Sequence, residues 1–212
     1  MIQFAGRNIP DRLEEIVEPK RSALLVWDMQ YDIATRAFNF QQIVSNIKSL
    51  TLSARQAGVT VIYSQQTAFD PKYETPAWIR RRIQQAKVSE PTQIPARTME
   101  GTRGWEVVDE LKPQAGDVVF KKHRPSAFIA TDLEMILRNR DISTVMLTGV
   151  STEGGVEGSA RHGLNLGYYM VVVRDCVGSH DREAHDLALK YMETTFDVVD
   201  SKQLLAIWEK AR

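Results

Sequence analysis

The sequence predicts an α/β protein with a doubly wound, six-stranded and mainly parallel sheet that carries helices on both faces. Six short runs rich in Val, Ile and Leu are almost continuously apolar, as strands are when both faces of a parallel sheet are covered. Segments with helical periodicity separate these runs, and this alternation is typical of a doubly wound fold. The length of 212 residues suits a substantial core, so we expect a single domain over residues 1–212.

The predicted strands follow one another along the whole chain. The first is ALLVWDM at residues 23–29, and VTVIYS follows at 59–64. The remaining apolar runs are DVVFKK at 117–122, TVMLTGV at 144–150, YYMVVVRD at 168–175 and DVVD at 197–200.

The clearest predicted helix covers residues 40–58, with the sequence FQQIVSNIKSLTLSARQAG. It places Ile43, Ile47, Leu50 and Ala54 on one face, and Gly58 suits the position after a helix C-terminus. The other helical segments are PAWIRRRIQQAK at 76–87, TDLEMILRNRD at 131–141, DREAHDLALKYMET at 181–194 and SKQLLAIWEKAR at 201–212.

A long connection without any strand pattern runs from Gln65 to Gly104 and is interrupted by prolines and glycines. Connections of this length usually form lids or binding segments, so we expect a lid or substrate-binding segment over residues 65–104. The basic run at 80–82 suits either a solvated helix face or an anion-binding role. Side chains expected to contribute to specificity in or near this lid are Trp78, Arg82, Arg97, Trp105 and Phe128.

Composition excludes several classes of partner. The 27 Lys and Arg residues balance the 27 Asp and Glu residues, so nothing favours nucleic acid or an anionic membrane. No apolar run reaches the roughly 18 residues of a membrane span, and the start lacks the order of a signal peptide. The single cysteine, Cys176, cannot form an internal disulfide, and we interpret it as an ordinary buried residue. We expect a cytoplasmic protein that acts on a small molecule.

The candidate chemistry lies at the ends of the predicted strands. Ligands bind beyond the carboxyl ends of such strands, where Asp28 ends the apolar run of the first strand and Lys121, Lys122 and His123 close the third. The fourth strand runs into the glycine-rich turn GVSTEGGVEGSARHG at residues 149–163. A sharp turn of this kind often presents a nucleophile, but here its tip offers none for acyl transfer.

The segments LLVWDMQ, KKHRPSAF and GVSTEGGVEGSAR, in this order, resemble the isochorismatase-like hydrolase family, also called the cysteine hydrolase superfamily. This family includes isochorismatases, nicotinamidases and N-carbamoyl amidohydrolases. The resemblance implies the strand order 3-2-1-4-5-6, with Asp28 facing the glycine-rich turn and Lys122 nearby. It also implies a cis peptide between Val150 and Ser151, and a homo-oligomer, either a dimer or a tetramer.

The sequence departs from the amidases of this family at one position. These amidases carry a nucleophilic cysteine in the first turn of the helix that follows the fourth strand, and the matching residue here is Gly155. Glycine cannot form an acyl-enzyme. Isochorismatases of the family also have glycine there and keep the aspartate and lysine; they cleave a vinyl ether. The resemblance therefore implies a catalytic set of Asp28, Lys122 and Gly155.

In such a reaction Asp28 would protonate the vinyl carbon, and water would capture the resulting oxocarbenium ion. Lys122 would hold a substrate carboxylate or orient Asp28, and Gly155 would leave room for the substrate beside free backbone N–H groups. The residues expected to bind substrate are Ser151, Thr152, Glu153, Gly154, His123, Trp78, Trp105 and Phe128.

Two of these residues allow more than one interpretation. Glu153 suits either a structural role, through the helix dipole, or a role in orienting water. Thr152 and its neighbour Ser151 are interpreted as turn or capping hydroxyls, because no histidine is evidently aimed at them.

No cofactor and no metal are expected, because the stretch YSQQTAFD lacks the histidine of the Asp/His cluster in nicotinamidases. Two other functions remain open. GVSTEG followed by Asp175 is a near miss for a dinucleotide-binding motif, with Ser151 in place of its second glycine. Loss of the thiol also fits a non-catalytic binding or structural protein that keeps the fold.

Overall fold

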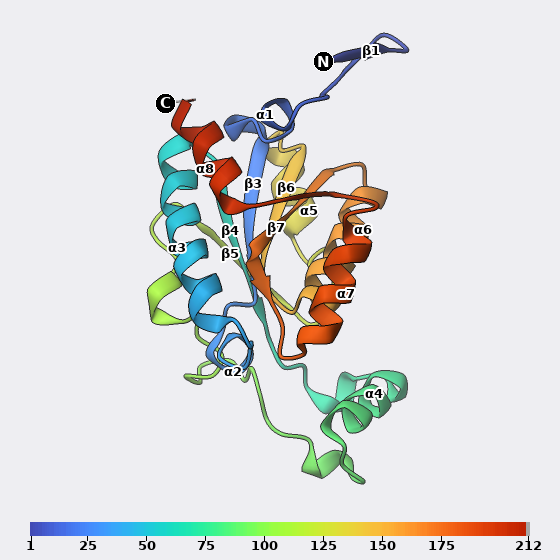
Figure 1. Ribbon diagram of the computed structural model, residues 1–212. Coiled ribbons are helices and arrows are strands. Elements are labelled where there is room, and N and C mark those ends of the chain that lie inside the picture. Colours follow the sequence, from blue (N-terminus) through green and yellow to red (C-terminus); the bar gives the residue numbers. More distant parts are fainter. Residues whose placement is uncertain (211–212) are drawn as a thin grey trace.

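A computed structural model describes residues 1–210 and shows a six-stranded, fully parallel sheet (Figure 1). The strand order β5-β4-β3-β6-β7-β8 confirms the predicted order 3-2-1-4-5-6. The strands are β3 (Ser22–Trp27), β4 (Thr60–Gln66), β5 (Val118–Lys122), β6 (Thr144–Val150), β7 (Tyr169–Gly178) and β8 (Asp197–Val199).

Four strands end at other residues than predicted: β7 continues to Gly178, β8 stops at Val199, and the ends of β3 and β4, which border the site, also differ. β3 stops at Trp27 because Asp28 takes a left-handed backbone conformation, with φ 46°, that cannot continue a strand. β4 continues to Gln66, because the pairing of Gln66 with Lys122 extends the ladder with β5. The connection predicted to begin at Gln65 therefore begins after Gln66.

Helices cover both faces of the sheet (Figure 1). α3 (Phe40–Ala57) and α8 (Ser201–Lys210) pack on one face, whereas α5 (Leu133–Asn139), α6 (Glu157–Asn165) and α7 (Arg182–Met192) pack on the other. The last two residues of the helix predicted over 201–212 lie outside the described residues. No helix among residues 1–210 is long and apolar enough to cross a membrane.

Two hydrophobic cores result from this layering. The predicted face of α3 is confirmed, since all four of its side chains are fully buried and Gly58 ends the helix with φ 83°. Alternate residues of β3 point to opposite cores: Val26 faces α3 and α8, while Trp27 faces α5, α6 and α7. This alternation places the Trp27 ring on the side of the sheet where α6 begins.

Several short elements were not predicted. An N-terminal hairpin of β1 (Ile2–Phe4) and β2 (Arg7–Ile9) projects from the body (Figure 1). Its three-residue strands are too short to show a periodicity. The other short helices are α1 (Leu13–Ile16), α2 (Tyr31–Ala34) and the 3₁₀ turns Pro19–Arg21, Pro71–Tyr73, Pro91–Gln93 and Asp109–Leu111.

The connection between β4 and β5 contains α4 (Pro76–Ala86), which lies away from the sheet (Figure 1). Thr75 begins α4 by accepting a hydrogen bond from the Trp78 amide, and Pro76 suits the first helical position. α4 has no buried residue. Its side chains are therefore available to line a cleft rather than to fill a core.

Candidate active site

Asp28 lies at the carboxyl end of β3, between the ends of β4 and β6. Its carboxylate is buried, with 1% of the side chain exposed. Ser64, near the end of β4, donates its hydroxyl to Asp28 Oδ1 at 2.7 Å and accepts the Asp28 backbone N–H at 3.2 Å. These bonds hold the carboxylate at a defined position at the edge of the sheet.

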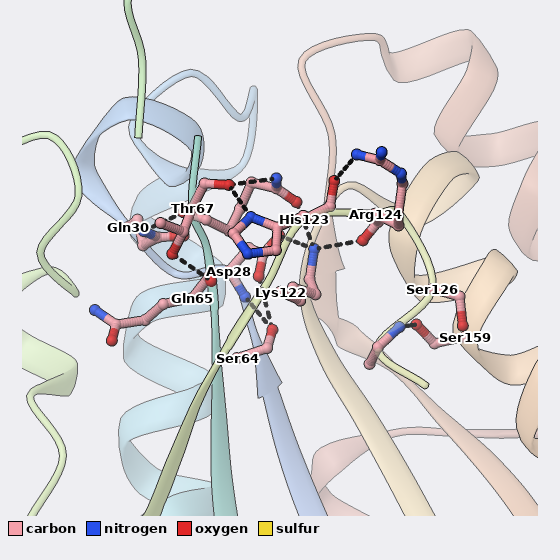
Figure 2. A network of polar contacts seen from close by, with 12 residues as sticks. Asp28, Gln30, Ser64, Gln65, Thr67, Lys122, His123, Arg124, Ser126 and Ser159 are labelled. Carbon is pink, nitrogen blue, oxygen red and sulfur yellow. Dashed lines mark hydrogen bonds and ion pairs between the residues drawn. The ribbon is translucent and has the colours of Figure 1, made fainter. Parts of the chain in front are cut away.

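Lys122 is the last residue of β5 and reaches past β4 to Asp28. The distance from its Nζ to Asp28 Oδ2 is 2.6 Å, and the side chain is fully buried. The ammonium also donates to Gln66 Oε1 at 2.9 Å and to the Arg124 carbonyl at 3.2 Å. Figure 2 shows this network, in which Ser64 approaches Asp28 from the adjacent strand β4 and Lys122 from β5, one strand further away.

Burial governs the protonation of this pair. It raises the pKa of Asp28 above its ordinary value, although the Lys122 ammonium and the Ser64 hydroxyl act in the opposite direction. Burial likewise lowers the pKa of Lys122, against the effect of the carboxylate. The pKa values of the two groups are thus closer together than in water.

The glycine-rich turn follows β6 directly. The peptide between Val150 and Ser151 is cis, as the resemblance implied. Thr152–Val156 then forms a π-helical turn that leads into α6. Gly155 is buried in this turn, and a Cβ there would lie 1.7 Å from Trp27 Cζ2. The structure therefore corrects one expectation: the space beside Gly155 is filled by the indole and is not open to substrate.

The Trp27 ring also contacts the lysine. Lys122 Nζ lies 3.8 Å from the ring centroid, the geometry of a cation–π contact. Only 5% of Trp27 is exposed. The indole thus lies against both Lys122 and the glycine-rich turn.

A cavity of about 280 Å³ opens at this edge of the sheet. It joins a wider space of about 740 Å³ beneath α4, since Gln66, Trp78 and Arg97 line both. The inner wall includes Trp27, Asp28, Pro125, Ser151, Gly154 and Gly155. Asp28 and Gly155 therefore share one hollow.

Three arginines line the inner cavity: Arg36, Arg81 and Arg97. Within residues 1–210 none of them forms an ion pair, whereas Arg124 pairs with Glu74 at 2.9 Å. Unpaired guanidinium groups around a cavity favour an anionic ligand. Of the basic run at 80–82, Arg81 and Arg82 line the cleft, and Arg80 bonds Gln84 on the surface.

The structure brings some predicted binding residues to the cleft and not others. Trp78, Ser151 and Gly154 line the inner cavity, and His123 lines the wider space, where its Nδ1 lies 2.8 Å from the Thr67 carbonyl. The predicted residues that line neither space are Thr152, Glu153, Trp105 and Phe128.

The last four residues have structural partners. Trp105 donates its indole N–H to Thr67, and Phe128 packs in the core. Glu153 accepts a hydrogen bond from Ser179 at 2.9 Å. Thr152 donates to the Gly178 carbonyl and lies 2.8 Å from His185 Nδ1, so a histidine does face it, contrary to the sequence analysis. These partners come from distant strands and helices, which local sequence does not reveal.

Sequence reasoning missed four groups at the site: Trp27, Ser64, Gln66 and Arg36. The first three lie at or near strand ends, as Asp28 does. An apolar or uncharged residue at a strand end does not by itself indicate acid–base chemistry. Arg36 follows α2, a helix too short to predict.

Cys176 is fully buried, as expected, and burial raises the pKa of its thiol. No group of three potential metal ligands occurs among residues 1–210.

Fold and site together define an α/β protein with a buried acid–base pair at the carboxyl edge of a parallel sheet. The chain belongs to the isochorismatase family, because the model of the isochorismatase domain matches residues 22–203. This membership confirms the resemblance seen in the sequence, and the family includes hydrolases.

Two kinds of relative accompany this assignment. The chain is 32% identical over 214 residues to the ureidoacrylate amidohydrolase RutB of Pseudomonas syringae pv. syringae, covering 92% of this chain and 87% of that one. RutB of Yersinia enterocolitica is 33% identical, covering 87% and 88%. A cysteine hydrolase from Pseudomonas syringae pv. phaseolicola superposes with a TM-score of 0.80 at 24% identity, covering 93% and 96%. Nicotinamidase PncA from Bacillus subtilis gives a TM-score of 0.72 at 26% identity, covering 85% and 99%.

Proposed function

We propose that this protein hydrolyses a small anionic metabolite with the Asp28–Lys122 pair and without a cysteine nucleophile, in a reaction of the vinyl ether type. The observation that carries the proposal is the buried ion pair, in which Lys122 lies behind Asp28 and Asp28 lines a cavity together with Gly155, a residue without a side chain. The unpaired arginines around the cavity support an anionic substrate. The only cysteine, Cys176, belongs to β7 and is buried in the core that this strand forms with α3 and α8.

In this mechanism protonated Asp28 delivers its proton to the terminal vinyl carbon, and the double bond becomes an oxocarbenium ion. Water adds to the cation and returns a proton to Asp28. The resulting hemiketal then breaks its C–O bond to give a ketone and an alcohol. Lys122 stabilises the carboxylate that Asp28 becomes after it has given up its proton.

The proposal is tested with a substrate panel of isochorismate, ureidoacrylate, nicotinamide and an N-carbamoyl amino acid. Ureidoacrylate is included because the relatives named above are ureidoacrylate amidohydrolases. We expect wild type to release pyruvate from isochorismate and Asp28→Asn to release none. Ammonia from an amide substrate would instead indicate an amidohydrolase. No turnover of any compound, with binding retained, would favour the non-catalytic alternative.

The arginines provide a separate prediction about binding. Arg81→Gln should raise KM about tenfold with kcat little changed, because it removes one charged contact to the substrate anion. Arg80→Gln is the matched control, since Arg80 is adjacent to Arg81 on α4 but bonds Gln84 and lines neither space. Equal KM values for the two variants, measured by steady-state kinetics, would contradict an anion-binding role for Arg81.

A further inference from the structure

Trp27 accounts for glycine at two positions of the segment 149–163: Gly149, near the end of β6, and Gly155, in the turn that follows. Gly149 pairs with Trp27 across the sheet, with φ 104°, and a Cβ at Gly149 would lie 1.9 Å from the Trp27 carbonyl oxygen. A Cβ at Gly155 would meet the Trp27 ring itself, because it would lie 1.7 Å from Cζ2 and 1.8 Å from Cη2. Distances this short leave no volume for any side chain at either position.

The indole cannot easily move away from Gly155. Its edge abuts the glycine, while the Lys122 ammonium lies above its ring. The rest of Trp27 is part of the core formed with α5, α6 and α7. A side chain added at position 155 would therefore displace a ring that is held by core packing and by a buried cation.

We propose that Trp27 is a specificity-determining residue: its indole occupies the volume that a nucleophilic side chain at position 155 would need, and so restricts the site to attack by water. This inference rests on the proposed function, because it assumes that position 155 faces the reacting atom of the substrate. Gly155 and the Trp27 indole then form one unit. Substitution of either residue alone should disrupt the packing between them. Substitution of both should leave room for a side chain at position 155.

A double-mutant cycle tests the steric part of this inference. Gly155→Ala alone should lower Tm by about 10 °C or prevent folding. In a Trp27→Val background the same substitution should lower Tm by less than half as much, because the smaller side chain frees the volume. An equal shift in both backgrounds overturns the inference, as does failure of Gly155→Ala to fold in both when Trp27→Val folds alone.

Thiol reactivity tests the chemical part. Gly155→Cys and Trp27→Val/Gly155→Cys are treated with iodoacetamide, and alkylation is followed by intact mass. Wild type supplies the background, since Cys176 is fully buried. The double variant should alkylate at least tenfold faster than Gly155→Cys alone, because its thiol opens onto the cavity beside Lys122. Equal rates in two variants that both fold overturn the inference, whereas failure of Gly155→Cys alone to fold supports its steric part.

Neither measurement requires turnover, so the two proposals can fail separately. A wild type that hydrolyses no compound of the panel, with strong coupling between the two positions, contradicts the proposed function alone. A wild type that cleaves isochorismate, with no coupling in stability or alkylation, contradicts only the role of Trp27. Activity of Trp27→Val/Gly155→Cys on the amide substrates, absent from wild type, would further support Trp27 as the residue that restricts the reaction.

Discussion

Asp28→Asn is expected to lower kcat by at least about a hundredfold, because it removes the group that donates the proton. The side chain is nearly isosteric and can still accept the Ser64 hydroxyl, so the geometry of the edge should persist. Lys122, however, is left fully buried without its anion. Breaking a buried pair in this way costs about 3–5 kcal/mol, less to the extent that Lys122 gives up its proton.

A second variant separates catalysis from stability. Asp28→Asn/Lys122→Met removes the orphaned ammonium, so its unfolding free energy should exceed that of Asp28→Asn while activity stays absent. Urea denaturation and steady-state kinetics measure the two quantities. If Asp28→Asn retains the kcat of wild type on the panel substrate, Asp28 has no part in the reaction.

Lys122→Met is expected to give the protein a stability that falls as pH rises. Without the ammonium, burial holds the folded pKa of Asp28 above the value of about 3.9 in the unfolded chain. Between these two values the folded state binds a proton that the unfolded state has released. The contribution of Asp28 is therefore complete below about pH 4 and is lost as pH rises through the folded pKa, by up to about 1.4 kcal/mol per unit.

The control for this prediction lacks the carboxyl group. The difference in unfolding free energy between Lys122→Met and Asp28→Asn/Lys122→Met isolates Asp28 from every other group that titrates between pH 4 and 8. Urea denaturation across that range supplies the measurement. If the unfolding free energies of the two variants change with pH in parallel, Asp28 ionises in the folded state as it does in water. That result would contradict the prediction.

Much of this protein follows from local sequence. The apolar runs predicted all six strands of the sheet, because strands buried on both faces need continuous apolar residues. The resemblance carried by the strand-end segments supplied their order, and Asp28 and Lys122 do meet at one edge. Asp28 itself was expected inside a strand, and only the structure shows the positive φ that turns it out of β3.

Tertiary structure alone decided how the site is filled. Gly155 suggested an open space, yet the residue that fills it, Trp27, lies more than a hundred positions earlier in the chain. Likewise, Arg36 and Arg81 line one cavity only because folding brings α4 near the segment that follows α2. Local periodicity determines which elements form, since it reflects contacts a few residues apart. The volume beside a glycine and the pairing of a buried charge depend on side chains from distant strands, which meet only after the sheet has assembled.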